Sequence, residues 1–394
     1  MHSFDFDAPI ERRGTWSAKF DGAKNFGKPE GLLPLWVADM DFPAPPAVKE
    51  ALEKCVNFGI FGYSTPDDTY IDAVTDWYTR RHAWTPRAEW LVKTSGVCVA
   101  LAMAVRSLTK EGDGVLIQPP VYYPFANTIR NNHRIIVESP LIYKEGRYSI
   151  DFADFEAKAA NADVKAFILC NPHNPVCRVW TQEELQKLGD ICHRHGVFVI
   201  SDEIHGDITL TEHAYTPYLR ANPTLENETI VCTAPSKTFN LAGLQASNIF
   251  IPNADVRAAF RREIDAAGLG LLNLAGLVAC KAAYTGGEKW LDACLAYMRG
   301  NLDYLRDYLA TSIPEIQLVE PEGTYFAWLD CSALGFDSAD ELDAFITERA
   351  GLWLDAGQMF GPEAGQFQRV VLACRRELLA EALERLKAAV NSLR

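Results

Sequence analysis

Two residues in this sequence have the types and the setting needed for amine chemistry. Lys237 lies between hydroxyl residues in the stretch A-P-S-K-T-F-N, downstream of Asp202 in S-D-E-I-H. A lysine amine becomes a nucleophile near neutral pH only where its surroundings disfavour the ammonium ion. Pyridoxal phosphate requires such a lysine for its aldehyde and an acid that keeps its pyridine nitrogen protonated. We therefore predict a pyridoxal phosphate site with Lys237 as the catalytic amine and Asp202 as the partner of the nitrogen, although each residue taken alone is more often a surface lysine or a helix N-cap.

The phosphate of such a cofactor needs backbone amides at a helix N-terminus, together with hydroxyl groups. The stretch T-S-G-V-C-V-A at 94–100 is a small-residue turn that opens an apolar helical segment. It offers the amides of Gly96, Val97 and Cys98, and Ser236 adds a hydroxyl beside Lys237. The alternative interpretation of this stretch is an ordinary helix start.

Aromatic and cationic side chains elsewhere could serve the cofactor ring and the substrate. Prolines on both sides of Tyr122 and Tyr123 predict a rigid, irregular loop. A ring in this loop could stack on the pyridine and a phenol could pass a proton, or the two tyrosines could simply pack. The carboxylate of an amino-acid substrate suits a bidentate arginine, for which Arg369, Arg375 and Arg376 are candidates unless they are solvated rim residues.

The composition limits the kinds of partner. The chain of 394 residues carries 38 Lys and Arg against 52 Asp and Glu, a net charge of −14, so its surface should repel nucleic acids and anionic membranes. Small molecules are the expected partners. The ten cysteines include no C-x-x-C pair, which argues against a metal site and against a disulfide framework. The N-terminus has no apolar stretch of signal-peptide length, and no apolar run is long enough to span a membrane, so we expect a cytoplasmic protein.

Short β-branched runs alternate with segments of helical period, which predicts an α/β fold with a mostly parallel sheet wound by helices. The expected strands lie at 115–118, 134–137, 164–170, 196–201 and 229–233. Thr181 and Glu184 form a capping-box pattern that begins a helix ending near Gly196. Ligands bind beyond the carboxyl ends of the strands in such a sheet. The loops after three of these strands carry Asn174, Asp202 and Lys237, so one crevice could collect all three.

The character of the sequence changes after about residue 285, where long helical periodicity replaces the alternation. Short strands are expected at 325–329 and 370–373, followed by a helix with a leucine-rich stripe. We therefore expect an N-terminal arm at 1–45, a large domain at 46–285 and a smaller α+β domain at 286–394 that the arm completes.

Several blocks of the sequence together resemble one family. They are L-P-L-W-V-A-D-M-D-F at 33–42, V-Y-Y-P-F at 121–125, N-P-H-N-P-V-C-R-V-W at 171–180, S-D-E-I-H at 201–205 and A-P-S-K-T-F-N-L-A-G-L-Q at 234–245. This set is similar to the MalY/PatB group of fold-type I pyridoxal phosphate enzymes, which are aminotransferase-like cystathionine β-lyases. The resemblance implies a large domain with a mostly parallel, seven-stranded sheet. It also implies β-elimination of cystathionine, another S-substituted cysteine or cysteine to a thiol, pyruvate and ammonia.

The resemblance further implies a role for each matching residue. Lys237 would bind the cofactor and move the Cα proton, Tyr123 would assist the leaving group, and Arg369 would bind the substrate carboxylate with help from the backbone at Ala38. Tyr63 in F-G-Y-S resembles a tyrosine that reaches the phosphate in the neighbouring subunit, which implies a homodimer. The other matches are cofactor contacts: Asp202 at the pyridine nitrogen, Asn174 and His205 near the ring hydroxyl, Tyr122 on the ring, and Gly96, Val97, Cys98 and Ser236 at the phosphate.

Some positions depart from the family pattern. Cys177 stands where glycine is usual, Val371 where asparagine is usual, and Arg375 where proline is usual, which leaves the substrate preference and the choice of carboxylate arginine open. Gln245 stands where class I and II aminotransferases have a phosphate-binding arginine, and this points to the lyase branch. The alternatives are a class I/II aminotransferase and a MalY-like protein with an added regulatory binding role.

Overall fold

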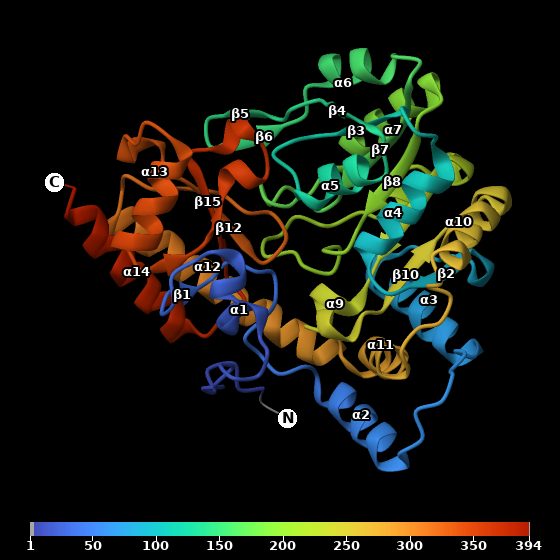
Figure 1. The fold of residues 1–394 in the computed structure, drawn as a ribbon, viewed down its shortest axis with the longest axis horizontal. Helices are drawn as coiled ribbons and strands as arrows, with labels where there is room; N and C mark the ends of the chain where they lie inside the picture. The colour runs from blue at the N-terminus through green and yellow to red at the C-terminus, as the bar shows by residue number, and fades with distance from the viewer. Residues whose placement is uncertain (1–3, 394) are drawn as a thin grey trace.

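The computed structural model describes residues 4–393, and its largest element is a sheet of seven strands (Figure 1). The strand order is β2-β10-β9-β8-β7-β3-β4. β10 runs antiparallel to both of its neighbours, and the other pairings are parallel. The strands are β2 (Leu91–Thr94), β3 (Gly114–Ile117), β4 (Ile135–Glu138), β7 (Val164–Cys170), β8 (Phe198–Asp202), β9 (Thr229–Thr233) and β10 (Ser247–Phe250).

Helices cover both faces of this sheet (Figure 1). One face packs against α4 (Val97–Leu108), α5 (Pro124–Asn131) and α10 (Ala254–Ala266). The other packs against α3 (Asp68–His82), α6 (Phe152–Ala159), α7 (Gln182–His195) and α11 (Leu274–Gly286). Successive side chains of a strand point to opposite faces, so Phe167 and Leu169 join one core while Ala166 and Ile168 join the other. Burial on both faces explains why this strand reads as an almost continuous apolar run.

The C-terminal part has its own antiparallel sheet, in the order β11-β12-β15-β14. Its strands are β11 (Gln317–Val319), β12 (Phe326–Asp330), β14 (Asp355–Ala356) and β15 (Phe367–Val371), accompanied by α12 (Glu288–Ser312), α13 (Ala339–Ala344) and α14 (Arg376–Asn391). From the N-terminal segment, β1 (Leu33–Pro34) pairs with β13 (Leu352–Trp353), and α1 (Ala18–Asp21) and α2 (Pro46–Phe58) flank it in sequence. The division into an arm at 1–45 and domains at 46–285 and 286–394 stays a prediction.

The sequence located most of the large sheet. The strands expected at 164–170 and 229–233 match β7 and β9 at both ends, and the other three expected strands lie within two residues of β3, β4 and β8. The pattern missed β2 and β10, which hold only two apolar residues each. The predicted helix is α7: its capping box is formed by Thr181 and Glu184, and Gly196 ends it with φ of 67°. None of the helices in residues 4–393 is both long and apolar enough to cross a membrane.

Candidate active site

A cavity of about 210 Å³ lies at the carboxyl ends of the strands of the large sheet. Ten of the residues selected from the sequence line it: Ala38, Gly96, Val97, Cys98, Tyr122, Asn174, Asp202, His205, Ser236 and Lys237. Tyr63, Tyr123 and Arg369 are outside this lining. The fold therefore gathers into one place residues that are scattered over about half of the chain, because the loops after parallel strands meet at one edge of the sheet.

Lys237 is a half-buried residue whose amine is held by a backbone carbonyl. It lies in the short helix α9 (Pro235–Thr238), directly after β9, and its Nζ donates a hydrogen bond to the Ala38 carbonyl at 2.7 Å. Burial and the nearby charge of Arg369 lower the pKa of Lys237 to about 8, against the opposing effect of Asp39 and Asp202. Roughly one fifth of this amine is therefore neutral at about pH 7.4, far more than for an ordinary lysine, and the neutral form is the one that a nucleophile or base requires.

Asp202 is the last residue of β8 and is almost completely buried. Its Oδ1 accepts a hydrogen bond from the Ile204 amide at 3.1 Å, and no lysine, arginine or histidine of the described residues forms an ion pair with it. Burial raises the pKa of Asp202 to about 7, and the neighbouring charge of Glu203 acts in the same direction. A buried carboxyl group that lines a cavity and forms no ion pair with the described residues fits a ligand that brings a protonated nitrogen.

The N-terminus of α4 forms another wall of the cavity. Gly96 precedes this helix with φ of 153°, and no side chain of the described residues caps the helix. The first amides of α4 are therefore free to bind an anion, which the helix dipole favours. Ser236, beside Lys237, brings a hydroxyl to the same cavity. This wall fits a phosphate group.

Arg369 lies on β15 and is almost fully buried beside the cavity. Its Nη1 donates to Asn174 Oδ1 at 2.7 Å, its Nη2 donates to the Trp36 carbonyl at 3.1 Å and to Asp355, and the guanidinium stacks on Phe326. Its Nε has no partner among the described residues. Arg369 is thus connected to the cavity through Asn174, and its Nε is the donor left for a further acceptor.

The other two arginine candidates point elsewhere. Arg375 pairs with Glu377 at 3.0 Å, and the Nε of Arg376 donates to Asn301 at 2.7 Å while its guanidinium lies over the ring of Tyr304. Neither contacts a residue that lines the cavity. Of the three arginine candidates for the substrate carboxylate, Arg369 is therefore the one connected to the cavity, a distinction that the sequence alone did not make.

The aromatic candidates differ in their positions. Tyr122 lines the cavity, with its hydroxyl 4.0 Å from Cys98 Sγ. Tyr123 is half-buried next to Phe360, and burial together with the charge of Asp355 raises its pKa, so its phenol stays protonated at neutral pH. His205 is buried against aromatic rings, and burial with the charge of Lys237 holds its pKa well below the ordinary value, so the ring is neutral.

Tyr63 lies away from this cavity, on the surface. Its side chain is 95% exposed and borders a shallow hollow formed with residues of α2 and α11. The side chains around it are also apolar and exposed: Phe58, Ile60 and Phe61. Within one chain, Tyr63 is not part of the site.

Some residues of the site were missed by sequence reasoning. Asp355 pairs with Arg369 because the two are opposite each other in adjacent antiparallel strands, a register that no motif signals. Tyr325 donates to the same Ala38 carbonyl as Lys237, at 3.0 Å. Asn240 lies inside the recognised block at 234–245, and it adopts a left-handed φ of 58°, a conformation for which Asn is more suited than most residue types.

Known proteins of similar length resemble this chain in sequence and in fold. The chain is 43% identical over 387 residues to the cystathionine β-lyase PatB of Bacillus subtilis, covering 98% of this chain and 100% of the relative. It is 32% identical over 394 residues to the protein MalY of Escherichia coli, covering 99% and 100%. Cystalysin from Treponema denticola, whose crystal structure contains pyridoxal 5′-phosphate, matches with a TM-score of 0.96 and 38% identity over 100% of both chains.

A pyridoxal phosphate-bound C-S lyase from Staphylococcus hominis matches with a TM-score of 0.92 and 35% identity, covering 98% of both chains. Residues 30–386 match the aminotransferase class I and II family. Together with the fold, these matches show that the chain belongs to the aminotransferase class I and II family, on the branch of PatB and MalY.

Proposed function

We propose that this protein is a pyridoxal phosphate-dependent carbon–sulfur β-lyase. It cleaves cystathionine, a related S-substituted cysteine or cysteine, and releases a thiol, pyruvate and ammonia. The observation that carries the proposal is a pair of groups at one cavity: the Lys237 amine with a lowered pKa, and the buried Asp202 carboxyl group, which forms no ion pair with the described residues. The full-length relative named cystathionine β-lyase supports the reaction, and the relatives with bound pyridoxal phosphate support the cofactor.

The residues around the cavity fit this cofactor. Asp202 would pair with its pyridine nitrogen, Asn174 would contact its ring hydroxyl with His205 nearby, and the ring of Tyr122 would pack on it. The phosphate would bind Ser236 and the amides of Gly96, Val97 and Cys98 at the start of α4. When bound, the cofactor supplies an electron sink for the charge left at the substrate Cα.

The chain's own side chains move the protons and orient the substrate. Lys237 takes the Cα proton, a task that a base with a pKa of about 8 performs well near neutral pH. Tyr123 gives a proton to the leaving sulfur. Arg369, held by Asp355 and Asn174, binds the substrate carboxylate through its free Nε, with the Ala38 backbone beside it.

An aminotransferase would use the same cofactor contacts, so a substrate panel separates the two functions. The purified protein is incubated with cystathionine, cysteine or alanine, without a keto acid, and pyruvate, thiol and sulfide are measured. We expect sustained pyruvate and thiol release from cystathionine and none from alanine. The Lys237→Ala variant should lose this release, whereas Lys144→Ala, at an exposed site, should keep it. Sustained turnover only when a keto acid is added would make the protein an aminotransferase.

We also propose that the protein acts as a homodimer in the cytoplasm. The exposed Phe58, Ile60, Phe61 and Tyr63 form an apolar surface of a kind that monomers rarely leave uncovered. A second copy that covers it would bring its Tyr63 toward the phosphate site of its partner. The ten free cysteines fit a reducing compartment.

A further inference from the structure

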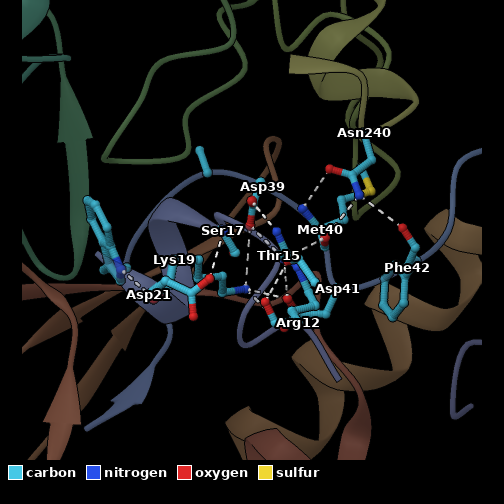
Figure 2. Close-up of polar contacts among 12 residues, drawn as sticks. Arg12, Thr15, Ser17, Lys19, Asp21, Asp39, Met40, Asp41, Phe42 and Asn240 are labelled. Atoms are coloured by element: carbon cyan, nitrogen blue, oxygen red, sulfur yellow. Dashed lines mark hydrogen bonds and ion pairs between the residues drawn. The ribbon is translucent and has the colours of Figure 1, made fainter. Parts of the chain in front are cut away.

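Four charged side chains of the N-terminal segment form a compact cluster (Figure 2). Arg12 binds Asp39 with two hydrogen bonds, at 3.1 and 2.7 Å, and binds Asp41 Oδ1 at 2.7 Å. Lys19, whose side chain is completely buried, binds both oxygens of Asp41 at 2.9 Å. Two cations and two carboxylates make the cluster neutral. It is built from residues up to 29 positions apart, so the fold of this segment depends on it.

The cluster is joined directly to the loop that carries the catalytic lysine (Figure 2). The Met40 carbonyl accepts from Arg12 Nη1 at 3.2 Å and from Asn240 Nδ2 at 2.9 Å. Asn240 also accepts from the Met40 amide at 3.0 Å and donates to the Phe42 carbonyl at 2.9 Å. Asn240 lies three residues after Lys237. The segment 38–42 is therefore fixed from one side by charges and from the other by the lysine loop.

The first residue of the segment 38–42 is Ala38, whose carbonyl holds the Lys237 amine. Ala38, next to Asp39, accepts the hydrogen bond from Lys237 Nζ and lines the cavity. Lys19 and Asp41 are buried, whereas Arg12 and Asp39 are partly exposed. Burying charges costs free energy that their attraction often fails to return, so stability alone does not account for the two buried charges. The charged groups also form hydrogen bonds of defined direction: the two bonds from Arg12 fix both the position and the orientation of Asp39.

We propose that Arg12, Lys19, Asp39 and Asp41 form an ionic latch that holds residues 38–42 against the lysine loop and so keeps the Ala38 carbonyl on the Lys237 amine. The four are positioning residues, and none is required to touch the substrate. The inference rests on the proposed role of Lys237 and extends that site to the N-terminal segment.

The latch also sets the charge that Lys237 experiences. The groups that act on Lys237 are Arg369, which with burial lowers its pKa, and Asp39, Cys98 and Asp202, which raise it. Arg12 neutralises Asp39. Removal of Arg12 should therefore raise the pKa of Lys237, because a nearby positive charge is lost and Asp39 keeps only its longer contact of 3.8 Å to Lys19. Removal of the Asp39 charge should lower it. If the cluster served only to stabilise the fold, the Arg12 and Asp39 variants would not shift the pKa of Lys237 in opposite directions.

The test measures the titration of Lys237 in the full chain without cofactor. Cyanate modifies only neutral amines, and peptide mass analysis reports the extent of modification at Lys237 against pH. The wild type should be half-modified near pH 8. Arg12→Met should shift this midpoint up by roughly 0.5–1 pH unit, Asp39→Asn should shift it down by a similar amount, and the double variant should return toward the wild type. Arg13→Met, at an exposed neighbouring arginine, is the matched control and should leave it unchanged.

Hydrogen exchange tests the geometry separately. The Met40 and Asp41 amides are bonded to Asn240 and to the Ala373 carbonyl, so both should exchange faster in Arg12→Met and Asp39→Asn but not in Arg13→Met. Arg12→Lys, which keeps the charge and loses the two-pronged geometry, should keep the wild-type midpoint while exchange increases.

Shifts of the same sign in Arg12→Met and Asp39→Asn, or no shift in either, would reject the latch even if both melting temperatures fall. If Arg12→Met does not fold, Asp39→Asn decides: an unchanged midpoint and unchanged exchange reject the inference. Neither measurement needs turnover. If Lys237 titrates as expected in all variants but the wild type makes no pyruvate, the proposed lyase function is refuted and the latch is supported. If the wild type makes pyruvate but the midpoints do not shift as expected, the latch alone is refuted.

Discussion

At Asp202, burial raises the carboxyl pKa to about 7 in the chain without cofactor. In the unfolded chain the same group ionises at about pH 4. The folded state therefore bears a penalty that is absent below about pH 4, grows between about pH 4 and 7, and is complete above that range. This acid therefore destabilises the cofactor-free protein at the pH at which the proposed enzyme works, and under the proposed function a protonated nitrogen bound beside Asp202 would relieve the penalty.

Asp202→Asn should therefore stabilise the cofactor-free chain at pH 8 by an amount on the order of 2 kcal/mol and have little effect at pH 4. The asparagine keeps an oxygen for the Ile204 amide. Denaturant titrations at the two pH values measure the difference, and the same variant should lose most of its lyase activity. An equal effect at both pH values would show that the carboxyl charge is not the cause.

The proposed proton donation by Tyr123 can be tested by comparing substrates with different leaving groups. Its raised pKa keeps the phenol protonated, so Tyr123→Phe should slow elimination of a thiolate by roughly 10²-fold or more. It should slow elimination of chloride from β-chloroalanine far less, because chloride needs no proton. The ratio of kcat/KM for cystathionine to that for β-chloroalanine is the measurement. An equal loss for both substrates would assign Tyr123 to binding rather than to proton transfer.

At the scale of elements, α7 connects the two strands whose ends carry Asn174 and Asp202. Its first turn is fixed by Thr181, whose Oγ1 accepts from the Glu184 amide at 3.1 Å while Glu184 accepts from the Thr181 amide at 2.8 Å. Thr181→Ala removes one half of this box and should lower the free energy of unfolding by about 1 kcal/mol.

The activity of Thr181→Ala should remain within roughly twofold of the wild type, because β7 and β8 keep their places in the sheet. Thr181→Ser retains the oxygen and serves as the control for stability. A large fall in kcat without loss of stability would mean that the helix start affects the cavity directly.

At the scale of the whole molecule, the proposed dimer can be tested by mixing variants that are each inactive. Tyr63→Ala and Lys237→Ala subunits are unfolded together and reassembled. If Tyr63 serves the partner's site, one site of each mixed dimer has neither lesion, and the mixture should recover about one quarter of wild-type activity. Mixing Asp202→Asn with Lys237→Ala should recover none, because both residues line the same cavity. No recovery with Tyr63→Ala, or full activity of that variant alone, contradicts the role.

What the sequence determined by itself was local. Continuous apolar runs identified the central strands β7 and β9, because a strand that is buried on both faces is apolar at nearly every position instead of at every second one. The polar loops after those strands supplied Asn174 and Lys237, because parallel strands deliver their following loops to one edge. The strands β2 (L-V-K-T) and β10 (S-N-I-F) escaped prediction because each holds only two apolar residues, whereas β3 and β4, of the same length, hold three.

The tertiary structure decided what depends on contacts between distant residues. Lys237 and Ala38 are 199 positions apart, and only packing of the N-terminal segment on the lysine loop brings the carbonyl to the amine. Arg369, rather than Arg376, meets Asn174 because β15 runs beside the cavity whereas α14 begins away from it. Spacing constrains neighbours within an element, but the burial that lowers an amine's pKa is a property of the assembled core.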